Sequence, residues 1–367
     1  MNHSMFLFKQ LPFFAFLFIG LFVLLILLFK YRTRTSMTLY YLSFVPLALG
    51  LGEFWMWAES ALQLSSTFFE GSYKTNHMVP DKELGFRLTQ GPRQVQSIKR
   101  SRSGELIYNV TYGINADGLR EVAHNGSGPS ALFFGDSFTF GEGVGDADDL
   151  PARFAQISGY SAFNFGVHGY GAHQFLRMLE VARAEQMGVR REHALVVFTL
   201  LPTHIDRAAG RAMWDSDGPL YQISSAGLEF RGPFQRSVTE RILKKSYIYR
   251  LLIDPFLSET RDRQRLLAIL EMASKIVERR YGTDMLVVVW DMGLQAPPSN
   301  AIARTEWLRD NLTKSGIPNI SVSQIKPQIQ GADYYIPGDG HPGTAAYLAV
   351  AEAILKYCNS VDCLKHH

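Results

Sequence analysis

The sequence predicts an α/β protein in which a three-layer α/β/α domain with a parallel central sheet follows two N-terminal transmembrane helices. Two observations carry this prediction. Two long apolar stretches precede residue 60, and from Ala131 onward continuous apolar runs alternate with amphipathic stretches. Strands of a parallel sheet read as continuous apolar runs because helices bury both of their faces. A chain of 367 residues accommodates one large domain and an anchor.

The first apolar stretch runs from Leu11 to Phe29 and contains only apolar residues and glycine. As a helix it would rise about 28 Å, close to the thickness of the hydrocarbon core. A cleaved signal peptide is the alternative. The second stretch runs from Met37 to about Trp57, with Glu53 as its single charge. Here the alternative is a helix that lies in the membrane interface.

Three basic residues, Lys30, Arg32 and Arg34, lie between the two stretches, against one at Lys9. The positive-inside tendency places that link in the cytoplasm and everything after residue 60 outside. We therefore expect a two-helix anchor (residues 1–60) in the cytoplasmic (inner) membrane, with the domain that follows it facing the periplasm or the outside.

Residues 61–130 form a β-rich or irregular lead-in. Their clearest element is a strand over 107–114, which ends in the turn-forming run Asn115–Gly118. The α/β domain occupies residues 131–367, and residues 208–258 interrupt its pattern as an insertion. Its predicted strands are 131–134, 163–167, 193–201, 285–290 and 317–325, and its predicted helices are 150–157, 172–187, 261–281, 301–314 and 344–357.

Composition excludes several classes of function. The net charge is only +3 and no dense basic block follows residue 36, so nucleic-acid binding is not expected. The two cysteines, Cys358 and Cys363, form no Cys-x-x-Cys pair, and they are either bridged or unpaired thiols. No His-Glu-x-x-His spacing is present. We expect neither a catalytic metal nor a cofactor.

The residues that carry chemistry begin with Gly135-Asp136-Ser137, directly after the first predicted strand. A serine at the carboxyl end of a parallel strand is presented at the edge of the sheet where ligands bind. Its hydroxyl needs a base, and His341, just before the last helix, is the best candidate. Asp339 would orient the imidazole and stabilise its charged form.

These blocks resemble the SGNH/GDSL hydrolase superfamily, which includes esterases, lipases, thioesterases and carbohydrate O-acetyl transferases or deacetylases. The resemblance covers residues 131–357 and implies a flavodoxin-like sandwich with an active Ser137. The upstream runs Pro80–Arg87 and Asn115–Arg120 are similar to the lead-ins of bacterial envelope members of this group.

The resemblance also implies an oxyanion hole. In the run Asn164–Gly171, Gly169 matches the glycine that supplies a backbone amide, with Gly166 and Gly171 as alternatives. The amide of Ser137 would be the second donor. Each such donor lowers the barrier by about 3 kcal/mol.

The sequence departs from the family pattern in two blocks. The third block carries Thr203 or His204 where the family has an asparagine, which is a further oxyanion donor. The last block spaces Asp339 and His341 two apart instead of three.

Four further side chains are candidate substrate contacts. Asp136 is either a second functional carboxylate or a cap for the following helix. His168 and His173 follow the second strand and are expected near the site. Arg207, after the third strand, would hold an anionic substrate group or is a solvated loop charge.

The expected function is that of an extracytoplasmic serine esterase or O-acyltransferase with a Ser-His(-Asp) acyl-enzyme, and its substrate is O-acetylated cell-envelope carbohydrate or lipid-linked glycan. A transferase would also need an acyl donor, and therefore a partner in the membrane. The sequence leaves hydrolysis and transfer open. The alternative is a non-catalytic envelope module that binds carbohydrate or supports assembly, which the altered third block favours.

Overall fold

The structure is a computed structural model that describes residues 13–30, 44–64, 67–72, 77–123, 126–189, 193–212, 214–234, 237–291, 301–325 and 334–361. The chain divides into two compact units. The helical unit comprises Met1–Phe68 and Arg236–Thr260, and the sheet unit comprises Phe69–Gln235 and Arg261–His367.

Two helices, α2 (Phe13–Lys30) and α4 (Phe44–Leu64), pack against each other in the helical unit. Gly50 permits this close approach, because a Cβ atom there would lie 2.9 Å from a side-chain carbon of Ile19. Within the described residues, no helix has both the length and the apolar character needed to cross a membrane. The two predicted transmembrane helices are therefore not found, and the basic link between them lies outside the described residues.

The helical unit also contains a segment from the middle of the chain. This segment consists of α11 (Val238–Leu243), the π-helix η1 (Tyr249–Ile253) and the first residues of α12 (Asp254–Tyr281). The carboxylate of Glu53 in α4 accepts hydrogen bonds from the Ser246 hydroxyl and, at 2.7 Å, from the backbone N–H of Tyr247. The buried charge of Glu53 is thus satisfied by the segment that it holds.

The lead-in of the sheet unit is built from short strands. β1 (Thr67–Glu70), β4 (Arg93–Ser101) and β5 (Leu106–Ile114) form one sheet, and β2 (Met78–Asp81) pairs with β3 (Gly85–Leu88). The predicted strand 107–114 corresponds to β5, and the turn that follows it is closed by the Asn115 side chain, which accepts from the Leu119 backbone N–H at 2.9 Å.

The central sheet is parallel, as the apolar runs predict. Its strands are β6 (Ser130–Gly135), β7 (Ser161–Gly166), β8 (Leu195–Leu200), β11 (Met285–Val289) and β12 (Asn319–Ser321), in the order β12-β11-β8-β6-β7. Counted from the β7 edge in chain order, this is the flavodoxin-like arrangement 2-1-3-4-5. The strand order reverses beside β6. The carboxyl end of β6 is therefore the place where such sheets bind ligands.

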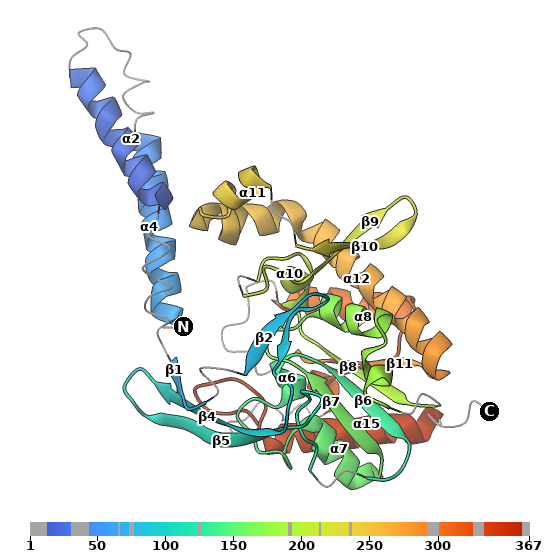
Figure 1. The fold of residues 1–367 in the computed structure, drawn as a ribbon. Coiled ribbons are helices and arrows are strands. Elements are labelled where there is room, and N and C mark those ends of the chain that lie inside the picture. The colour runs from blue at the N-terminus through green and yellow to red at the C-terminus, as the bar shows by residue number, and fades with distance from the viewer. Residues whose placement is uncertain are drawn as a thin grey trace. The chain divides into compact units, whose positions relative to one another are not determined.

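Helices cover both faces of this sheet. Besides α12, the helices of the sheet unit are α6 (Ser137–Phe140), α7 (Leu150–Ser158), α8 (Ala172–Glu180), α9 (Arg183–Gln186), α10 (His204–Ala208), α13 (Ala301–Lys314), α14 (Val322–Ile325) and α15 (Thr344–Val361). In Figure 1, α7 and α15 lie on one face, and α8 and the second half of α12 lie on the other. A hairpin of β9 (Pro219–Ser224) and β10 (Gly227–Pro233) adjoins α8.

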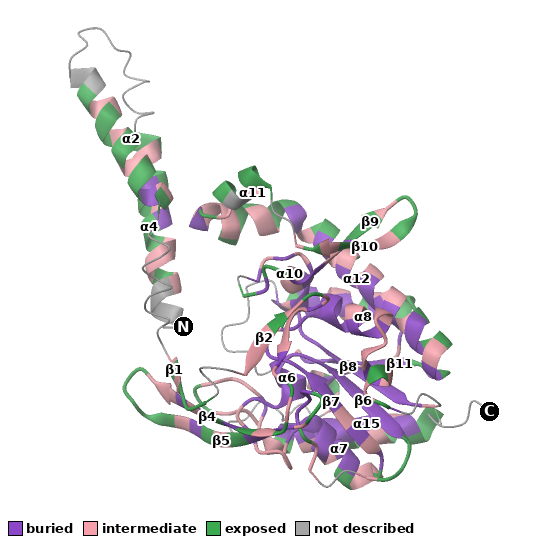
Figure 2. Ribbon diagram, viewed as in Figure 1, coloured by how far each residue is buried: buried purple, intermediate pink, exposed green. Residues whose placement is uncertain are grey.

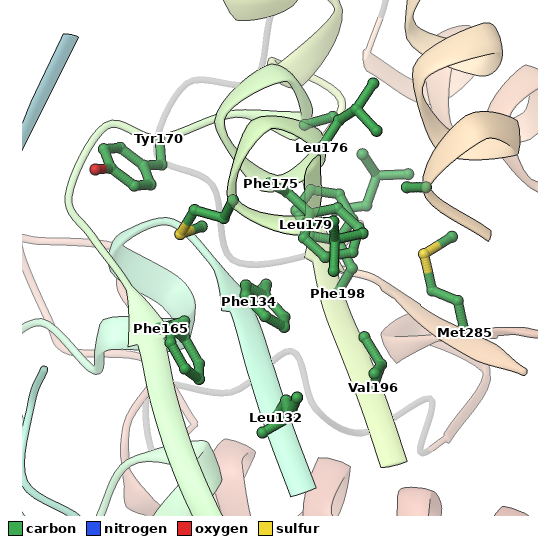
Figure 3. Close-up of a cluster of buried hydrophobic side chains, with 14 of the residues drawn as sticks. Leu132, Phe134, Phe165, Tyr170, Phe175, Leu176, Leu179, Val196, Phe198 and Met285 are labelled. Carbon is green, nitrogen blue, oxygen red and sulfur yellow. The ribbon is translucent and has the colours of Figure 1, made fainter. Parts of the chain in front are cut away.

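Alternate residues of β6 face the two halves of the core. Leu132 and Phe134 pack on the α8 side, and Ala131 and Phe133 pack on the α7 and α15 side. Figure 3 shows the first half, in which the rings of Phe134 and Phe165 stack with centroids 4.7 Å apart. Burial of large rings on both faces contributes most of the stability of such a sheet.

Two predicted elements differ from the structure. The predicted helix 172–187 is divided into α8 and α9 because Ala182 adopts a left-handed conformation, with φ 53°. The last predicted strand, 317–325, is only three residues long and continues into α14. Cys358 is buried, and the predicted alternative of a bridge to Cys363 involves a residue outside the described part of the chain.

Gly166 lies too close to α6 to carry a side chain. A Cβ atom at this position would lie 2.3 Å from the backbone nitrogen of Phe140 and 2.8 Å from the carbonyl carbon of Thr139. Gly166→Ala would therefore force α6 away from β7, and we expect it to lower the free energy of unfolding by roughly 1–3 kcal/mol, measured by urea denaturation.

Gly145→Ala is the matched control, because its nearest neighbour would be the Asp148 carboxylate at an ordinary 3.5 Å. Equal stability of the two variants would contradict the proposed close packing of α6 on β7.

Candidate active site

Ser137 is presented at the carboxyl end of β6. That strand is buried along its whole length, and Asp136 caps the short helix α6 by accepting a hydrogen bond from the Phe138 backbone N–H at 3.0 Å. Ser137 is the first residue of α6 and remains 9% exposed. The local fold thus places one hydroxyl at the reversal point of the sheet and orders the turn that carries it.

The cap residue Asp136 is held from behind by α10. Arg207 donates to its carboxylate at 2.6 Å, and Nε2 of His204 lies 3.4 Å from the same oxygen. Burial opposes ionisation of this carboxyl. However, the charge of Arg207 and the hydrogen bond to His204 outweigh burial and keep the pKa of Asp136 below its ordinary value. Asp136 is therefore an ionised cap under the nucleophile rather than an exposed substrate contact.

His341 reaches Ser137 from the far end of the sequence. Its Nε2 lies 2.8 Å from the Ser137 Oγ, and its Nδ1 lies 2.6 Å from the Asp339 Oδ2. The loop that carries both residues is closed by backbone hydrogen bonds from Ile336 to His341 at 2.9 Å and from Gly340 to Ile336 at 3.1 Å. The spacing of two residues between Asp339 and His341 therefore permits the orienting contact.

This arrangement can activate the serine. The imidazole accepts the Ser137 proton at Nε2, while Asp339 on the other ring nitrogen fixes the tautomer and stabilises the positive charge that develops. A hydroxyl activated in this way attacks acyl carbonyl carbons and forms a covalent acyl-enzyme.

A second carboxylate faces the same histidine. Glu142, two residues beyond α6, has its Oε2 at 3.6 Å from the His341 Nε2. Burial disfavours the charged form of His341. However, the carboxylates of Glu142 and Asp339 outweigh burial and raise the pKa of His341 above its ordinary value.

A buried arginine of the lead-in holds the loop after α6. Arg120 donates to the backbone carbonyls of Phe140 and, at 2.6 Å, Gly141, and it pairs with Asp149 at 3.2 Å. Its guanidinium also lies over the ring of Tyr112 at 4.6 Å. Arg120 is the last residue of the run Asn115–Arg120, so that motif acts on the loop around the nucleophile.

The predicted oxyanion residues lie on neighbouring strand ends. Gly135 and Gly166 are paired in register, and Gly169 lies in the turn that follows β7. Gly169 has φ 81°, and a Cβ atom there would lie 2.5 Å from the Trp214 Nε1. This conformation and this contact require glycine. Ser137 and Gly169 thus flank the same edge of the sheet.

The third block, which contains Thr203 and His204, does not have the role that the resemblance implied for it. His204 is fully buried against Asp136, and burial together with the charge of Arg207 lowers its pKa to about 4. It is therefore neutral and lies behind the nucleophile. Thr203 precedes α10, and its Oγ1 has no hydrogen-bond partner among the described residues.

The remaining candidates have structural partners. The Nε2 of His173 contacts Asp215 at 2.7 Å and its side chain is fully buried. His168 contacts Glu142 at 2.9 Å. Arg207 also donates to the Tyr170 carbonyl, so its guanidinium serves Asp136 and the turn after β7 rather than a solvent-exposed anion site.

Glu142, Asp339 and His341 also bring ligand atoms within 4.8 Å of one another, the spacing of a metal site. In this structure the Lys99 ammonium contacts both carboxylates, and the two ring nitrogens of His341 contact Asp339 and Ser137. The atoms that a metal would need are thus paired with one another and with a protein cation.

Sequence reasoning missed four residues that line this centre: Lys99, Tyr108, Glu142 and Trp214. Glu142 had a local signal, since it stands between two glycines immediately after the nucleophile block. Lys99 and Tyr108 had none, because strand periodicity identifies a face but not the residue that the face will meet.

No protein-family model and no curated protein matches the chain. Among solved structures, it is similar to a member of the lipolytic G-D-S-L family from Veillonella parvula, with 13% identity and a TM-score of 0.37 over 62% of this chain and 96% of that one. It is also similar to a lipase/acylhydrolase from Enterococcus faecalis, with 11% identity and a TM-score of 0.36 over 63% and 96%.

A third similar structure is the salicylyl-acyltransferase SsfX3 from a tetracycline biosynthetic pathway, with 14% identity and a TM-score of 0.37 over 66% of this chain and 57% of that one. Likeness at these levels does not define a function, so the catalytic interpretation depends on the side-chain geometry.

The geometry generates a prediction about pH. A fluorophosphonate probe should label Ser137, and the labelling rate should rise with pH as His341 loses its proton, because only the neutral imidazole can act as the base. Since Glu142 and Asp339 raise the pKa of His341, the half-maximal rate should lie above about pH 6.5.

Asp339→Asn should lower the labelling rate by roughly 10³–10⁴-fold, since it removes the group that orients the ring. Folded protein that takes up no label at any pH would instead favour a non-catalytic binding module.

Proposed function

We propose that this protein is a GDSL-type serine ester hydrolase or O-acyltransferase. The observation that carries the proposal is the contact of 2.8 Å between the Ser137 Oγ and the His341 Nε2, with Asp339 on the other ring nitrogen at 2.6 Å. These three groups form the Ser-His-Asp arrangement that supports covalent acyl transfer at a serine.

The reaction has two stages. In the first, the Ser137 Oγ attacks the ester carbonyl carbon as its proton passes to the His341 Nε2. The carbonyl oxygen becomes an oxyanion near the Ser137 and Gly169 amides, and the leaving alkoxide departs with the proton from His341. In the second, water or another hydroxyl gives its proton to His341 and attacks the acyl carbon of the acyl-serine. The bond from that carbon to the Ser137 Oγ then breaks, and His341 returns the proton to Oγ.

The substrate class is O-acetylated carbohydrate of the cell envelope, free or linked to lipid. An indole suits this substrate, because its broad apolar face can cover a sugar ring while its N–H bonds elsewhere. Trp214 has this arrangement: it is 59% exposed, and its Nε1 donates to the Gly169 carbonyl at 3.1 Å. A transferase would receive its acetyl group from a partner in the membrane.

The proposed place of work is the cytoplasmic (inner) membrane, which the helical unit would bind. The membrane argument rests on the helical unit, in which many apolar residues of α2 and α4 are exposed. Figure 2 shows exposed residues along both helices in green.

The segment 238–257 adds to this apolar surface. Phe256 is 84% exposed and Leu257 is 73% exposed, and Leu251 and Leu252 are exposed beside them. Exposed apolar side chains at this density are typical of surfaces that bind membranes. Lys245 lies in the same segment and suits anionic headgroups.

We expect Ser137→Ala to abolish release of acetate from p-nitrophenyl acetate and to change O-acetylation of the envelope glycan in cells. The physical reason is that the acyl-enzyme cannot form without the Oγ atom. Acetate release by purified wild-type protein, with and without an oligosaccharide acceptor, distinguishes a hydrolase from a transferase, because a transferase depends on the acceptor.

Unchanged glycan acetylation in Ser137→Ala cells, with acetate release lost in the purified variant, would remove the carbohydrate substrate and leave another ester. Retained acetate release in the purified variant would remove the catalytic assignment itself.

The membrane assignment predicts that the full-length protein binds anionic phospholipid vesicles, and that Phe256→Ser with Leu257→Ser weakens binding at least several-fold in a flotation assay. The paired change removes two exposed apolar side chains of the helical unit, each of which gains about 1.5–3 kcal/mol on full burial.

Ile302→Ser is the matched control, because Ile302 is 76% exposed in the sheet unit. Equal binding by the wild-type protein and the paired variant would show that this segment does not contact lipid.

A further inference from the structure

Glu142 is placed by the same turn that places the nucleophile. Gly141 ends α6 in a left-handed conformation, with φ 84°, and the backbone N–H of Glu142 donates to the Ser137 carbonyl at 3.0 Å. The carboxylate therefore has a fixed position relative to Ser137. Only 6% of the residue is exposed.

The lead-in hairpin β4–β5 holds this carboxylate. The Tyr108 hydroxyl donates to its Oε1 at 3.0 Å, and the Lys99 Nζ lies 3.6 Å from the same atom. The other oxygen, Oε2, contacts the His168 Nδ1 at 2.9 Å. A buried carboxylate with this many partners remains ionised, and its pKa is lowered well below the ordinary value because His341, His168 and Lys99 together outweigh burial.

The Nε2 of His341 therefore faces two oxygen atoms: the Ser137 Oγ at 2.8 Å, whose proton it accepts, and the Glu142 Oε2 at 3.6 Å. The charged groups around the ring are Asp339 from its own loop, Glu142 from the loop after α6, and Lys99 from β4, which contacts both carboxylates. The ring of Phe138 lies beside it at 5.2 Å and carries no charge.

A charge count shows what this arrangement favours. With His341 and His168 both neutral, the carboxylates of Glu142 and Asp339 and the ammonium of Lys99 leave the cluster with one net negative charge. When the Ser137 proton moves to His341, the imidazolium brings the cluster to neutrality. In a largely buried site, where water screens charges weakly, that change favours the proton transfer.

We propose that Glu142 is a positioning residue for acyl transfer: held by Tyr108 and Lys99, it stabilises the imidazolium form of His341 while the bond between the Ser137 Oγ and the acyl carbon forms. The proposal rests on the proposed ester chemistry. During the step, the proton leaves Oγ for Nε2, the Oγ–carbon bond forms, and the carbonyl electron pair moves to the oxyanion. In the tetrahedral intermediate, where the Oγ atom is bonded to the acyl carbon, the Glu142 carboxylate faces the Nε2–H of the imidazolium until the leaving group takes the proton.

The test measures the pH dependence of kcat/KM for p-nitrophenyl acetate in the full-length protein. Glu142→Gln keeps the size of the side chain and removes its charge. The midpoint of the acid limb should move to lower pH by roughly one unit, and the plateau rate should fall about tenfold. Lys99→Gln should move the midpoint the opposite way, because the ammonium lowers the pKa of His341.

Two controls separate charge from structure. Tyr108→Phe removes a hydrogen bond but leaves the Glu142 charge, so the midpoint should not move. Glu121→Gln removes a charge that contacts neither His341 nor Ser137 and should change nothing. The proposal would be overturned if Glu142→Gln lost rate equally at every pH and its midpoint did not move. It would also be overturned if the midpoints of Glu142→Gln and Lys99→Gln moved in the same direction.

A readout independent of turnover is the NMR titration of the His341 imidazole, assigned against His341→Gln. If wild-type protein cleaves no ester but the titration midpoint still falls in Glu142→Gln and rises in Lys99→Gln, the proposed function fails while the electrostatic role of Glu142 stands. If esterase activity is present and neither titration moves, the role of Glu142 fails alone. Should Glu142→Gln not fold, the direction of the shift in Lys99→Gln decides.

Discussion

The catalytic centre depends on one buried guanidinium. Arg120 donates to the carbonyls of Phe140, Gly141 and Val144, which are the turns of chain immediately after the nucleophile. It also pairs with Asp149, the residue that caps α7. Hydrogen bonds from a charged donor are stronger than neutral ones, and the carbonyls would be costly to leave unpaired. The loop from Ser137 to Asp149, Glu142 included, is therefore built around this side chain.

The sheet was predictable because the apolar pattern of a buried strand can be recognised from a few consecutive residues. Three central strands, β6, β8 and β11, read as continuous apolar runs, and the change of pattern at their ends allowed them to be located to within about two residues. Ser137 was identified by its position at such an end. The base was identified by the residues around it and by the resemblance, since 204 positions separate it from the serine.

The other side chains around Ser137 and His341 could not be predicted, because their positions depend on which faces of distant strands and loops pack together. Lys99 pairs with a carboxylate 240 residues away, and nothing in the alternation of β4 identifies that partner. The position of His204 in the third block was likewise not predictable from the residues around it. His204 has the residue type of a donor, yet the fold buries it on Asp136, where it supports an ionised cap. The predicted helix 172–187 is interrupted for a local reason. Ala182 adopts the left-handed conformation, which glycine usually occupies and which the sequence did not indicate here.

The hairpin β4–β5 gives this architecture a consequence for how the chain can be divided. By topology it is an accessory element, outside the parallel sheet and upstream of it. By electrostatics it is not accessory, because its Lys99 contacts both carboxylates beside His341. A shortened chain that began at β6 would retain Ser137, Asp339 and His341 but would lose the cation that pairs with Glu142 and Asp339, so the smallest unit that keeps this site intact is larger than the parallel sheet and its helices.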